Sequence, residues 1–309
     1  MRFKHIISVK QFLDIDILDK IFQLADEMEK NDKANKLQYS LKGKILATVF
    51  YEPSTRTRFS FESAMHKLGG SVITTESAPH FSSVTKGETL QDTIKVINGY
   101  ADAIVLRHQE EGSAKIASEV SSVPIINAGD GIGEHPTQAL LDLYTIKREF
   151  GKIDNLKIAL IGDLLYGRTI HSLIYLLALY KKVKIYLVSP KQLKLPEECK
   201  DYLTQKKIEF EELTDLNEVL DKIDVLYVTR IQKERFKSEQ EYGQAKDAYI
   251  IDRKIVNQLK ENTIIMHPLP RVNEISSELD GDKRAVYFRQ AQNGLYIRMA
   301  LLHLIFNNE

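Results

Sequence analysis

A short polar segment, residues 50–59, combines the residue types that bind phosphate. An apolar run ends at Phe50, Pro53 turns the chain, and a helix is expected to begin directly afterwards. The first turn of a helix offers N–H groups without intrahelical partners and the positive end of the helix dipole. Hydroxyl and guanidinium groups in that turn would complete an anion site. The segment is not a Walker loop, because the glycine spacing and the lysine of that motif are missing. The alternative is an ordinary Ser/Thr N-cap beside surface arginines. The candidate residues are Ser54, Thr55, Arg56 and Thr57.

Four arginines stand at the ends of predicted strands, where each strand should pass into a loop. A single arginine at such a position is usually a surface charge. Four of them indicate a shared function, because ligands of parallel α/β sheets bind beyond the carboxyl ends of the strands. These residues are Arg56, Arg107, Arg168 and Arg230.

A glycine-rich loop, residues 128–138, places His135 and Gln138 one helical turn apart at the start of another predicted helix. Its three glycines allow the backbone to approach a ligand closely. These residues therefore indicate a second part of a binding site. The alternative for His135 is a capping histidine with a purely structural role.

Two further segments carry weaker signals. Residues 267–271 read His-Pro-Leu-Pro-Arg, and the two prolines fix an extended backbone with few N–H groups. The carbonyls of this segment would be rigid acceptors suited to orienting an amine, with a stiff structural turn as the alternative. The polar loop at residues 77–88 contains Ser82 and Lys86, and by itself it is equally consistent with an ordinary surface loop.

The elements that must position these residues alternate between short apolar strands and amphipathic helices. Such alternation predicts right-handed βαβ units and parallel sheets covered by helices on both faces. Strands are expected at residues 44–50, 71–75, 103–106, 124–127, 157–161, 184–188, 207–211, 225–229 and 263–266. Helices are expected at residues 55–68, 89–100, 113–119, 136–150, 168–180, 196–205, 215–221 and 290–306.

The helix at residues 136–150 is interpreted as a bridge, because four predicted strands precede it and five follow it. Pro136 suits the first position of a helix and Gly151 its C-terminal cap. The first domain is expected at residues 1–150 and the second at residues 151–289, with residues 290–309 packing back on the first. The predicted fold class is α/β, with two doubly wound parallel-sheet domains and an active site in the cleft between them.

The composition excludes several classes of protein. Lys and Arg number 43 and Asp and Glu number 43, so the chain lacks the basic excess that non-specific nucleic-acid binding requires. One cysteine, Cys199, excludes an intrachain disulfide and a cysteine metal cluster. The sequence shows no run long enough to span a membrane and no signal-peptide pattern. We therefore expect a cytoplasmic protein that does not bind membranes.

Together these segments resemble the aspartate/ornithine carbamoyltransferase family, in order and spacing, over essentially the whole chain. The runs at residues 54–58 and 135–138 are similar to the carbamoyl-phosphate motifs of that family. The runs at residues 162–168, 229–232 and 267–271 resemble its aspartate branch. The ornithine branch carries a cysteine where this chain has Pro268, and a Ser-Met-Gly run that this sequence lacks. One departure is Leu165, where family members often have a basic residue.

The resemblance implies transfer of a carbamoyl group from carbamoyl phosphate to the amine of L-aspartate, in pyrimidine biosynthesis, without a cofactor or a metal. The residues that would hold the phosphate are Ser54, Thr55, Arg56 and Thr57. Those that would polarise the carbamoyl carbonyl and stabilise the oxyanion are Thr57, Arg107 and His135. Those that would orient the carbamoyl NH₂ group are Gln138 and the carbonyls of Leu269 and Pro270.

The resemblance also implies an aspartate site and a particular assembly. Arg168 and Arg230, with Gln232 nearby, would bind aspartate, whose two carboxylates suit bidentate arginine. Ser82 and Lys86 would reach into the site of a neighbouring subunit, and Lys86 would contact aspartate there. This arrangement implies a homotrimer with shared active sites. The family also includes assemblies with a separate zinc-containing regulatory chain.

Two other functions fit the same residues. One is a carbamoyltransferase that uses another amino acid, which competition between ornithine and aspartate would reveal. The other is a non-catalytic two-domain protein that binds an anionic ligand. Aspartate-dependent release of phosphate from carbamoyl phosphate would distinguish an enzyme from such a binding protein.

Overall fold

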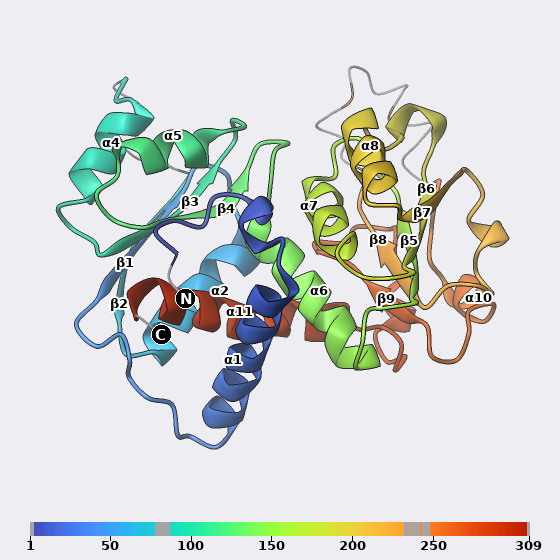
Figure 1. Ribbon diagram of the computed structural model, residues 1–309, viewed down its shortest axis with the longest axis horizontal. Helices are drawn as coiled ribbons and strands as arrows, with labels where there is room; N and C mark the ends of the chain where they lie inside the picture. Colours follow the sequence, from blue (N-terminus) through green and yellow to red (C-terminus); the bar gives the residue numbers. More distant parts are fainter. Residues whose placement is uncertain (1–2, 78–86, 232–235, 237–241, 243–247, 308–309) are drawn as a thin grey trace. The chain divides into compact units, whose positions relative to one another are not determined.

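The computed structural model describes residues 3–77, 87–231, 236, 242 and 248–307. The chain divides into two compact units, each built around one parallel sheet (Figure 1). Unit 1 comprises Met1–Leu141 and Gln292–Glu309, and unit 2 comprises Asp142–Ala291. The divisions fall inside two helices, α6 (Pro136–Phe150) and α11 (Tyr287–Phe306). Each of these helices therefore contributes residues to both units.

Unit 1 contains a four-stranded parallel sheet in the order β2-β1-β3-β4. Its strands are β1 (Ile45–Phe50), β2 (Ser71–Glu76), β3 (Ala103–His108) and β4 (Ile125–Asp130). Its other elements are η1 (Val9–Phe12), α1 (Ile15–Lys33), α2 (Thr55–Lys67), α4 (Leu90–Ile97) and α5 (Ser113–Val120). Figure 1 shows α4 and α5 on one face of the sheet and α2 on the other.

Side chains of β1 alternate between these two faces, as the period of a strand requires. Ala47 and Val49 pack in one cluster with Ile94 of α4 and Ala117 of α5. Thr48 points the opposite way, and its hydroxyl donates to the Glu62 carboxylate of α2 at 2.9 Å. The central strands β1 and β3 are therefore covered on both faces, which explains why most of their residues are apolar and buried.

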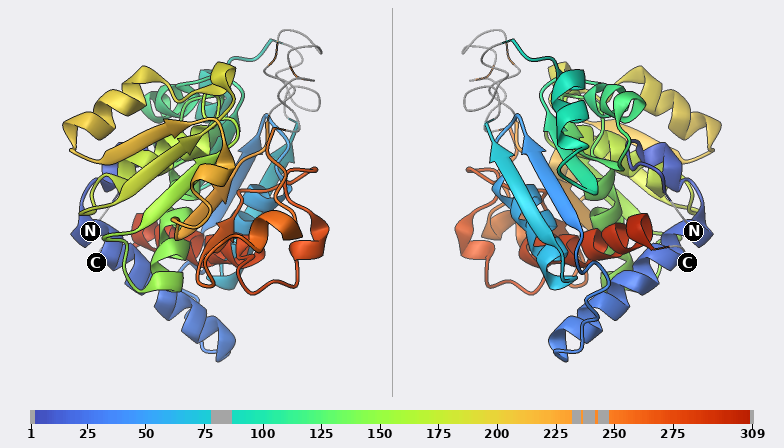
Figure 2. Two further views of the ribbon diagram at one scale, coloured as in Figure 1. Left: turned by 90° about the vertical axis from the view of Figure 1, so that its right-hand side faces the viewer. Right: turned by 90° about the vertical axis from the view of Figure 1, so that its left-hand side faces the viewer.

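Unit 2 contains a five-stranded parallel sheet in the order β7-β6-β5-β8-β9. Its strands are β5 (Lys157–Ile161), β6 (Lys184–Val188), β7 (Glu209–Leu213), β8 (Val225–Val228) and β9 (Ile264–Met266). Its other elements are α7 (Arg168–Leu177), η3 (Lys191–Leu193), α8 (Glu197–Gln205), η4 (Leu216–Glu218), α10 (Arg253–Val256) and η6 (Ser277–Leu279). Figure 2 shows the strands of each sheet side by side.

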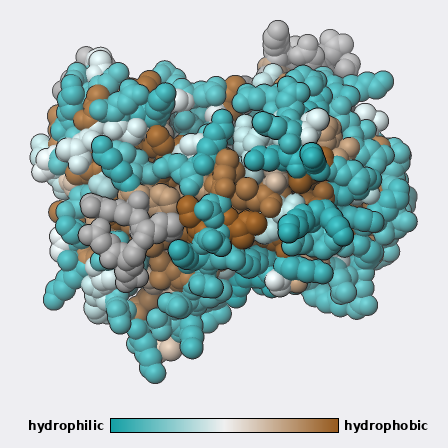
Figure 3. All heavy atoms as spheres, in the orientation of Figure 1, coloured by the Kyte–Doolittle hydropathy of each residue, from teal (hydrophilic) through white to brown (hydrophobic). Residues whose placement is uncertain are grey.

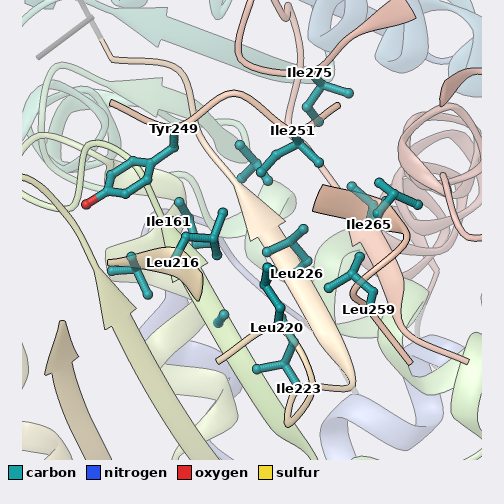
Figure 4. Packing of buried hydrophobic residues seen from close by; sticks show 14 of the residues in the cluster. Ile161, Leu216, Leu220, Ile223, Leu226, Tyr249, Ile251, Leu259, Ile265 and Ile275 are labelled. Atoms are coloured by element: carbon teal, nitrogen blue, oxygen red, sulfur yellow. The ribbon is translucent and has the colours of Figure 1, made fainter. Parts of the chain in front are cut away.

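The core of unit 2 on one face of the sheet is a cluster of buried, mostly aliphatic side chains that also includes Tyr249 (Figure 4). Ile161, Leu226 and Ile265 of three neighbouring strands contact Leu220 and Leu259 from the covering segments. Tyr227, between the cluster residues of β8, points to the opposite face. The internal strand β8 is therefore buried on both faces.

Each sheet has one point where the strand order reverses. In unit 1 the chain leaves β1 for one side and later returns to the other, so the reversal lies between β1 and β3. In unit 2 it lies between β5 and β8. Ligands of doubly wound sheets bind outside the carboxyl ends of the strands at this switch point.

The predicted fold class, α/β with two parallel-sheet domains, is confirmed, and all nine predicted strands are present in the described part of the chain. The predicted ends of β3 and β4 were too early, because Arg107 and residues 128–130 continue the strands instead of starting loops. The helix predicted at residues 215–221 is wrong, since only the short 3₁₀ turn η4 forms there. The long helix α1 and the short helix α10 were not predicted.

The surface is mostly hydrophilic on the face that Figure 3 shows, with apolar side chains between the hydrophilic ones. None of the helices in the described residues is long and apolar enough to cross a membrane. Within the same residues, His, Cys, Asp and Glu side chains form no group of three or more that could hold a metal ion.

Candidate active site

The turn after β1 presents its polar groups at the switch point of unit 1. Ser54 is the N-cap residue of α2, in extended conformation, but its side chain makes no capping hydrogen bond. The simple N-cap interpretation of this serine is therefore not supported. Thr57, in the first turn of the helix, is buried with 6% of its surface exposed. Hydroxyls and helix N–H groups thus lie together where an anion would be stabilised.

The two arginines of this turn have different environments. Arg58 is held by two carboxylates, with Nη1 2.8 Å from Glu76 Oε2 and Nε 3.6 Å from Glu62 Oε1. Glu76 also accepts from the Ser54 N–H at 3.1 Å, so this pair fixes the turn against β2. Arg56 is exposed, yet partial desolvation lowers its pKa. Arg58 is therefore structural, and Arg56 is the cation suited to an incoming anion.

Arg107 lies beside this turn because β3 pairs with β1. Phe50 is the register partner of Arg107, and the Tyr51 N–H donates to the Arg107 carbonyl at 2.8 Å. The guanidinium lies 3.4 Å from Glu52 Oε2 and donates to the Ala128 carbonyl at 3.3 Å. The register between β3 and β4 shifts at this point, as is common next to active sites. The structure therefore brings Arg107 to the same edge of the sheet as Ser54.

His108, the other ionisable group at the end of β3, has a structural role. Its Nδ1 accepts from the Glu110 N–H at 3.0 Å and lies 2.9 Å from the Ser113 hydroxyl. Its ring packs against Tyr51 with a centroid separation of 4.3 Å. Burial lowers the pKa of His108, which favours the neutral ring.

The loop that carries His135 is organised by one aspartate. Asp130 accepts from the Glu134 N–H at 2.9 Å and, through its second oxygen, from the Gly112 N–H at 3.0 Å. Gly131 has φ of +53°, and a Cβ there would lie 2.6 Å from the Gln109 carbonyl oxygen. Only glycine fits such a close approach. The loop is therefore a rigid support and not a free surface segment.

His135 directly precedes α6 and Gln138 lies in its first turn, so both stand at the start of this helix, as the sequence predicted. The His135 carbonyl accepts from the N–H groups of Gln138 and Ala139 at 3.0 and 3.1 Å. Both side chains are largely buried, with 4% and 8% of their surface exposed. The preceding residue, Glu134, anchors the loop because its carboxylate accepts from the Ser8 hydroxyl at 2.7 Å and the Val9 N–H at 2.5 Å.

Unit 2 places two arginines at its own switch point. Arg168 is the first residue of α7, in the connection after β5, and Arg230 follows β8, the neighbouring strand. The two strand ends are close together: a Cβ on Gly162, with φ of +111°, would lie 2.3 Å from the Thr229 carbonyl oxygen. Two bidentate cations at this edge suit a ligand with two carboxylates.

An apolar cluster supports the segments that carry these arginines. Leu165 and Tyr166 precede Arg168, and both pack against Leu193 and Ile231, the residue after Arg230. Leu165, the residue that departs from the family motif, therefore packs in an apolar cluster in this chain. The cluster joins the two arginine segments into one surface.

The remaining proposed site residues lie partly outside the described residues. The segment at residues 267–271 follows β9, and its Arg271 bonds to Asp280 and to the Tyr287 hydroxyl, the latter at 2.9 Å. Leu269 adopts the left-handed conformation with φ of +53°. Ser82, Lys86 and Gln232, which were predicted from the sequence, lie outside the described residues.

Sequence reasoning missed one buried cation of unit 1. Arg298 of α11 is 3% exposed, and its Nη2 lies 3.5 Å from Thr137 Oγ1 in the first turn of α6. Its guanidinium also stacks over Phe61 of α2 at 5.1 Å. A charged residue within the apolar run of residues 295–306 was the signal that could have revealed it. It adds positive charge behind the helix starts that carry His135 and Arg56.

Comparison with known protein families decides the relationship of the chain. Residues 4–148 match the carbamoyl-P binding domain of aspartate/ornithine carbamoyltransferases, and residues 154–305 match their Asp/Orn binding domain. The chain belongs to the aspartate/ornithine carbamoyltransferase family. The family resemblance predicted from the sequence motifs is thereby confirmed.

Individual carbamoyltransferases resemble the chain over nearly its full length. It is 56% identical over 307 residues to the aspartate carbamoyltransferase catalytic subunit of Methanocaldococcus jannaschii, covering 99% of both chains. It is 55% identical over 301 residues to the chloroplastic aspartate carbamoyltransferase 2 of Pisum sativum, covering 97% of this chain and 78% of that protein.

Solved carbamoyltransferase structures share the fold. The M. jannaschii catalytic subunit superposes with a TM-score of 0.90 at 54% identity, covering 97% of each chain. Aspartate transcarbamoylase from Trypanosoma cruzi, in complex with carbamoyl phosphate and aspartate, gives a TM-score of 0.93 at 41% identity, covering 98% of this chain and 97% of that one.

Proposed function

We propose that this chain transfers the carbamoyl group of carbamoyl phosphate to the amine of L-aspartate, giving N-carbamoyl-L-aspartate and phosphate in pyrimidine biosynthesis. The observation that carries the proposal is the position of Arg56, Arg107, Arg168 and Arg230 at the switch points of two sheets in a chain of this family. The relatives in M. jannaschii and P. sativum, both called aspartate carbamoyltransferases, support aspartate as the acceptor.

In the proposed mechanism, unit 1 binds carbamoyl phosphate. Ser54, Thr55, Arg56 and Thr57 bind the phosphate at the start of α2, where N–H groups and the dipole favour an anion. The amine of aspartate attacks the carbamoyl carbon, and negative charge develops on the carbonyl oxygen. Thr57, Arg107 and His135 stabilise that oxyanion. The bond between the carbamoyl carbon and the phosphate oxygen then breaks, and the phosphate leaves with the proton that the amine loses.

The carbamoyl NH₂ group needs acceptors that hold the carbon in the right orientation for attack. Gln138 and the backbone carbonyls of Leu269 and Pro270 take this role in the proposal. These groups take no part in bond making or bond breaking, so their contribution is to position the carbamoyl group.

In unit 2, Arg168 and Arg230 bind the two carboxylates of aspartate, and Gln232 assists them. Residues 1–150, with the C-terminal helix at residues 290–309, form the carbamoyl-phosphate domain in this proposal, and residues 151–289 form the aspartate domain. The description of the two matched family domains supports this division of roles.

The direct test is an assay of phosphate release from carbamoyl phosphate, with and without L-aspartate. Release that depends on aspartate, with N-carbamoyl-L-aspartate identified by mass spectrometry, is the expected result. L-ornithine serves as the matched acceptor, because it replaces the second carboxylate with a cation. Turnover with ornithine instead of aspartate would identify the other branch of the family, and binding without turnover would identify a non-catalytic anion-binding protein.

The proposed assembly is a homotrimer in which Ser82 and Lys86 complete the site of a neighbouring subunit. The test mixes inactive Lys86→Ala chains with inactive Arg56→Ala chains, dissociates them and allows trimers to reform. Because each variant damages a different half of a shared site, hybrids should regain activity well above either parent. Verified hybrids that stay inactive would contradict shared sites. The mass of the native assembly would show whether a regulatory chain is also bound.

The cytoplasmic location stays a prediction. The P. sativum relative is named as a chloroplastic protein, and the name of the M. jannaschii relative gives no compartment. Fractionation of the source cells, followed by detection of the chain, would decide the compartment.

A further inference from the structure

A buried histidine, His267, lies two residues before Leu269 in the segment that carries the Leu269 and Pro270 carbonyls. The mechanism above gives it no role. We infer that His267 is a positioning residue that fixes the backbone of Leu269 and thereby aims the acceptors for the carbamoyl NH₂ group. This inference rests on the proposed function, because it concerns the acceptors which that function assigns to the segment at residues 267–271.

The contacts of His267 define its protonation state. The side chain is 1% exposed, and its Nδ1 accepts from the Leu269 N–H at 2.7 Å. A ring nitrogen that accepts from an N–H carries no proton, so the neutral ring must carry its proton on Nε2. Nε2 lies 2.8 Å from Glu274 Oε1, to which it donates. His267 therefore holds Leu269 through one nitrogen and is itself held through the other.

The local backbone explains why Leu269 needs such support. Its φ of +53° lies in the left-handed region, which is unfavourable for a leucine because its Cβ crowds the backbone. Pro268 and Pro270 on either side have no N–H, so Leu269 supplies the only backbone N–H of residues 268–270. The hydrogen bond to His267 uses this donor. The carbonyls of the segment are then presented by a backbone fixed in one conformation.

Glu274 fixes the tautomer of His267. Its second oxygen accepts from the Val272 and Asn273 N–H groups at 3.0 and 3.2 Å. Burial by itself would raise the pKa of Glu274, but the hydrogen bonds from His267 and the backbone hold it below its ordinary value. The ionised carboxylate can only accept, and every one of these three neighbours donates to it. The proton of His267 is thereby kept on Nε2 and away from Leu269.

A buried network holds the other side of His267. The His267 N–H donates to the Gln290 side-chain carbonyl at 2.9 Å, and the Gln290 amide donates to Asp142 at 2.6 Å. Asp142 also accepts from the Tyr227 hydroxyl of β8 at 2.7 Å. Because all these groups are buried within unit 2, His267 is fixed to its central sheet, as a residue that aims substrate acceptors must be.

The test uses two substitutions that each keep one nitrogen position of the ring. In His267→Asn, the amide oxygen stands two bonds beyond Cβ, where it can replace Nδ1 and accept from Leu269. In His267→Gln, the amide stands three bonds beyond Cβ, where it can replace Nε2 and bond to Glu274 but not to Leu269. Both variants lose the aromatic ring, so each is a control for the loss of packing in the other.

The expected result separates positioning from general damage. His267→Gln should lose on the order of 10²-fold in kcat/KM for carbamoyl phosphate, as misplacement of the reacting group predicts, and His267→Asn should retain much more activity. Inhibition by inorganic phosphate should be the same in both variants, because phosphate has no NH₂ group for the carbonyls to accept from. Glu274→Gln should resemble His267→Gln. The amide that this substitution introduces has an NH₂ group where the carboxylate has an acceptor, and an NH₂ group that faces His267 favours the tautomer with its proton on Nδ1, which cannot accept from Leu269.

Hydrogen exchange supplies a readout that does not depend on turnover. A peptide covering residues 267–271 contains few amides because two of its residues are proline, so the Leu269 amide can be followed by mass spectrometry. It should be protected in the wild type and in His267→Asn but exchange rapidly in His267→Gln. Equal activities of the Asn and Gln variants, or a Gln variant with the higher activity, would overturn the inference.

A rapidly exchanging Leu269 amide in the folded wild type would also overturn it, even if neither variant folds. Wild-type chain that shows no transfer to aspartate would instead contradict the proposed function. In that case the exchange data still decide whether His267 fixes Leu269.

Discussion

At the carboxyl end of its sheet, unit 1 presents hydroxyls and helix N–H groups around one exposed arginine, whereas unit 2 presents two arginines on neighbouring strand ends. Ser54, Thr57 and Arg56 cluster at the start of α2, and Arg168 and Arg230 flank the reversal between β5 and β8. The sheets share a parallel, reversing topology. The chemistry of the two ends differs because different side chains occupy equivalent turns.

In the proposed function, this difference explains how one architecture would select two kinds of anion. Phosphate carries its charge on several oxygens around one atom, which suits a single helix start rich in N–H and hydroxyl donors. Aspartate carries two separate carboxylates, which suit two separate guanidinium forks. The topology determines where a ligand binds, and the residues at the strand ends determine which ligand it is.

The largest expected effect is at the helix start of unit 1. Arg56→Ala should reduce turnover by on the order of 10²–10³-fold or more, because it removes a charge-assisted donor from the leaving phosphate. Steady-state kinetics, with an unfolding curve to confirm an intact fold, would measure it. Arg56→Lys is the control that keeps the charge but loses the planar fork. Near-normal turnover of Arg56→Ala would show that the exposed arginine is not the phosphate ligand.

The second prediction tests whether the end of the unit 2 sheet serves aspartate and not carbamoyl phosphate. Arg230→Ala should lower kcat/KM for aspartate by on the order of 10–10²-fold, as loss of a charged hydrogen bond predicts, with little change in carbamoyl-phosphate binding. Initial-rate kinetics and equilibrium titration with carbamoyl phosphate would measure both. If carbamoyl phosphate binding suffered more than aspartate use, the contrast between the two units would be wrong.

The third prediction compares buried hydrogen bonds of the two units. Tyr227→Phe removes a donor at 2.7 Å from the fully buried Asp142 of unit 2, and should cost about 1–3 kcal/mol in the free energy of unfolding. Tyr296→Phe in unit 1 is the matched variant, because its hydroxyl lies 3.3 Å from the less buried Asp32. Urea denaturation should show a smaller loss for Tyr296→Phe. Equal losses would refute a special role for the buried network.

The smallest expected effect is a difference in pH dependence. Burial raises the pKa of Glu134 in unit 1 above its ordinary 4.5, and hydrogen bonds from Val9 and Ser8 only partly offset the shift. A carboxyl with a raised folded-state pKa makes folding less favourable as pH rises through that value. Wild type should therefore lose stability relative to Glu134→Gln as pH increases from 4.5. A constant difference across that range would contradict this assignment.

Unit 2 supplies the opposite case. A hydrogen bond from Arg284 is the main cause that lowers the pKa of Asp282 to about 2. This carboxylate stabilises the fold above its ordinary pKa of 3.8, and the contribution disappears as pH falls towards 2. Asp282→Asn should therefore differ from the wild type at neutral pH and converge with it in acid, as thermal unfolding at several pH values would show.

The sequence predicted the nine strands and the polar residues at their carboxyl ends, because apolar runs and the polar residues that follow them are local signals. It did not separate Arg56 from Arg58, because that distinction depends on Glu76 of another strand. It missed α1, although Asp14 caps that helix and its apolar residues recur at helical spacing. The contacts of Arg298 with Thr137 and Phe61 were hidden because these partners lie far away in the sequence. The side-chain partners of His267 lie within seven residues, but the pattern of the segment does not show which ring nitrogen meets which group.

The division of unit 1 into two stretches of sequence has a consequence for synthesis. A domain usually folds as its own stretch leaves the ribosome, with the N-terminal one first. Here residues 142–291 are complete before the part of α11 after residue 291 supplies the last part of unit 1, including Tyr296 beside Asp32 and His303 beside Ser40. The unit that begins the chain is thus the last to be completed. A nascent chain that reaches only residue 291 would expose the apolar surface that Leu301 and Leu302 bury.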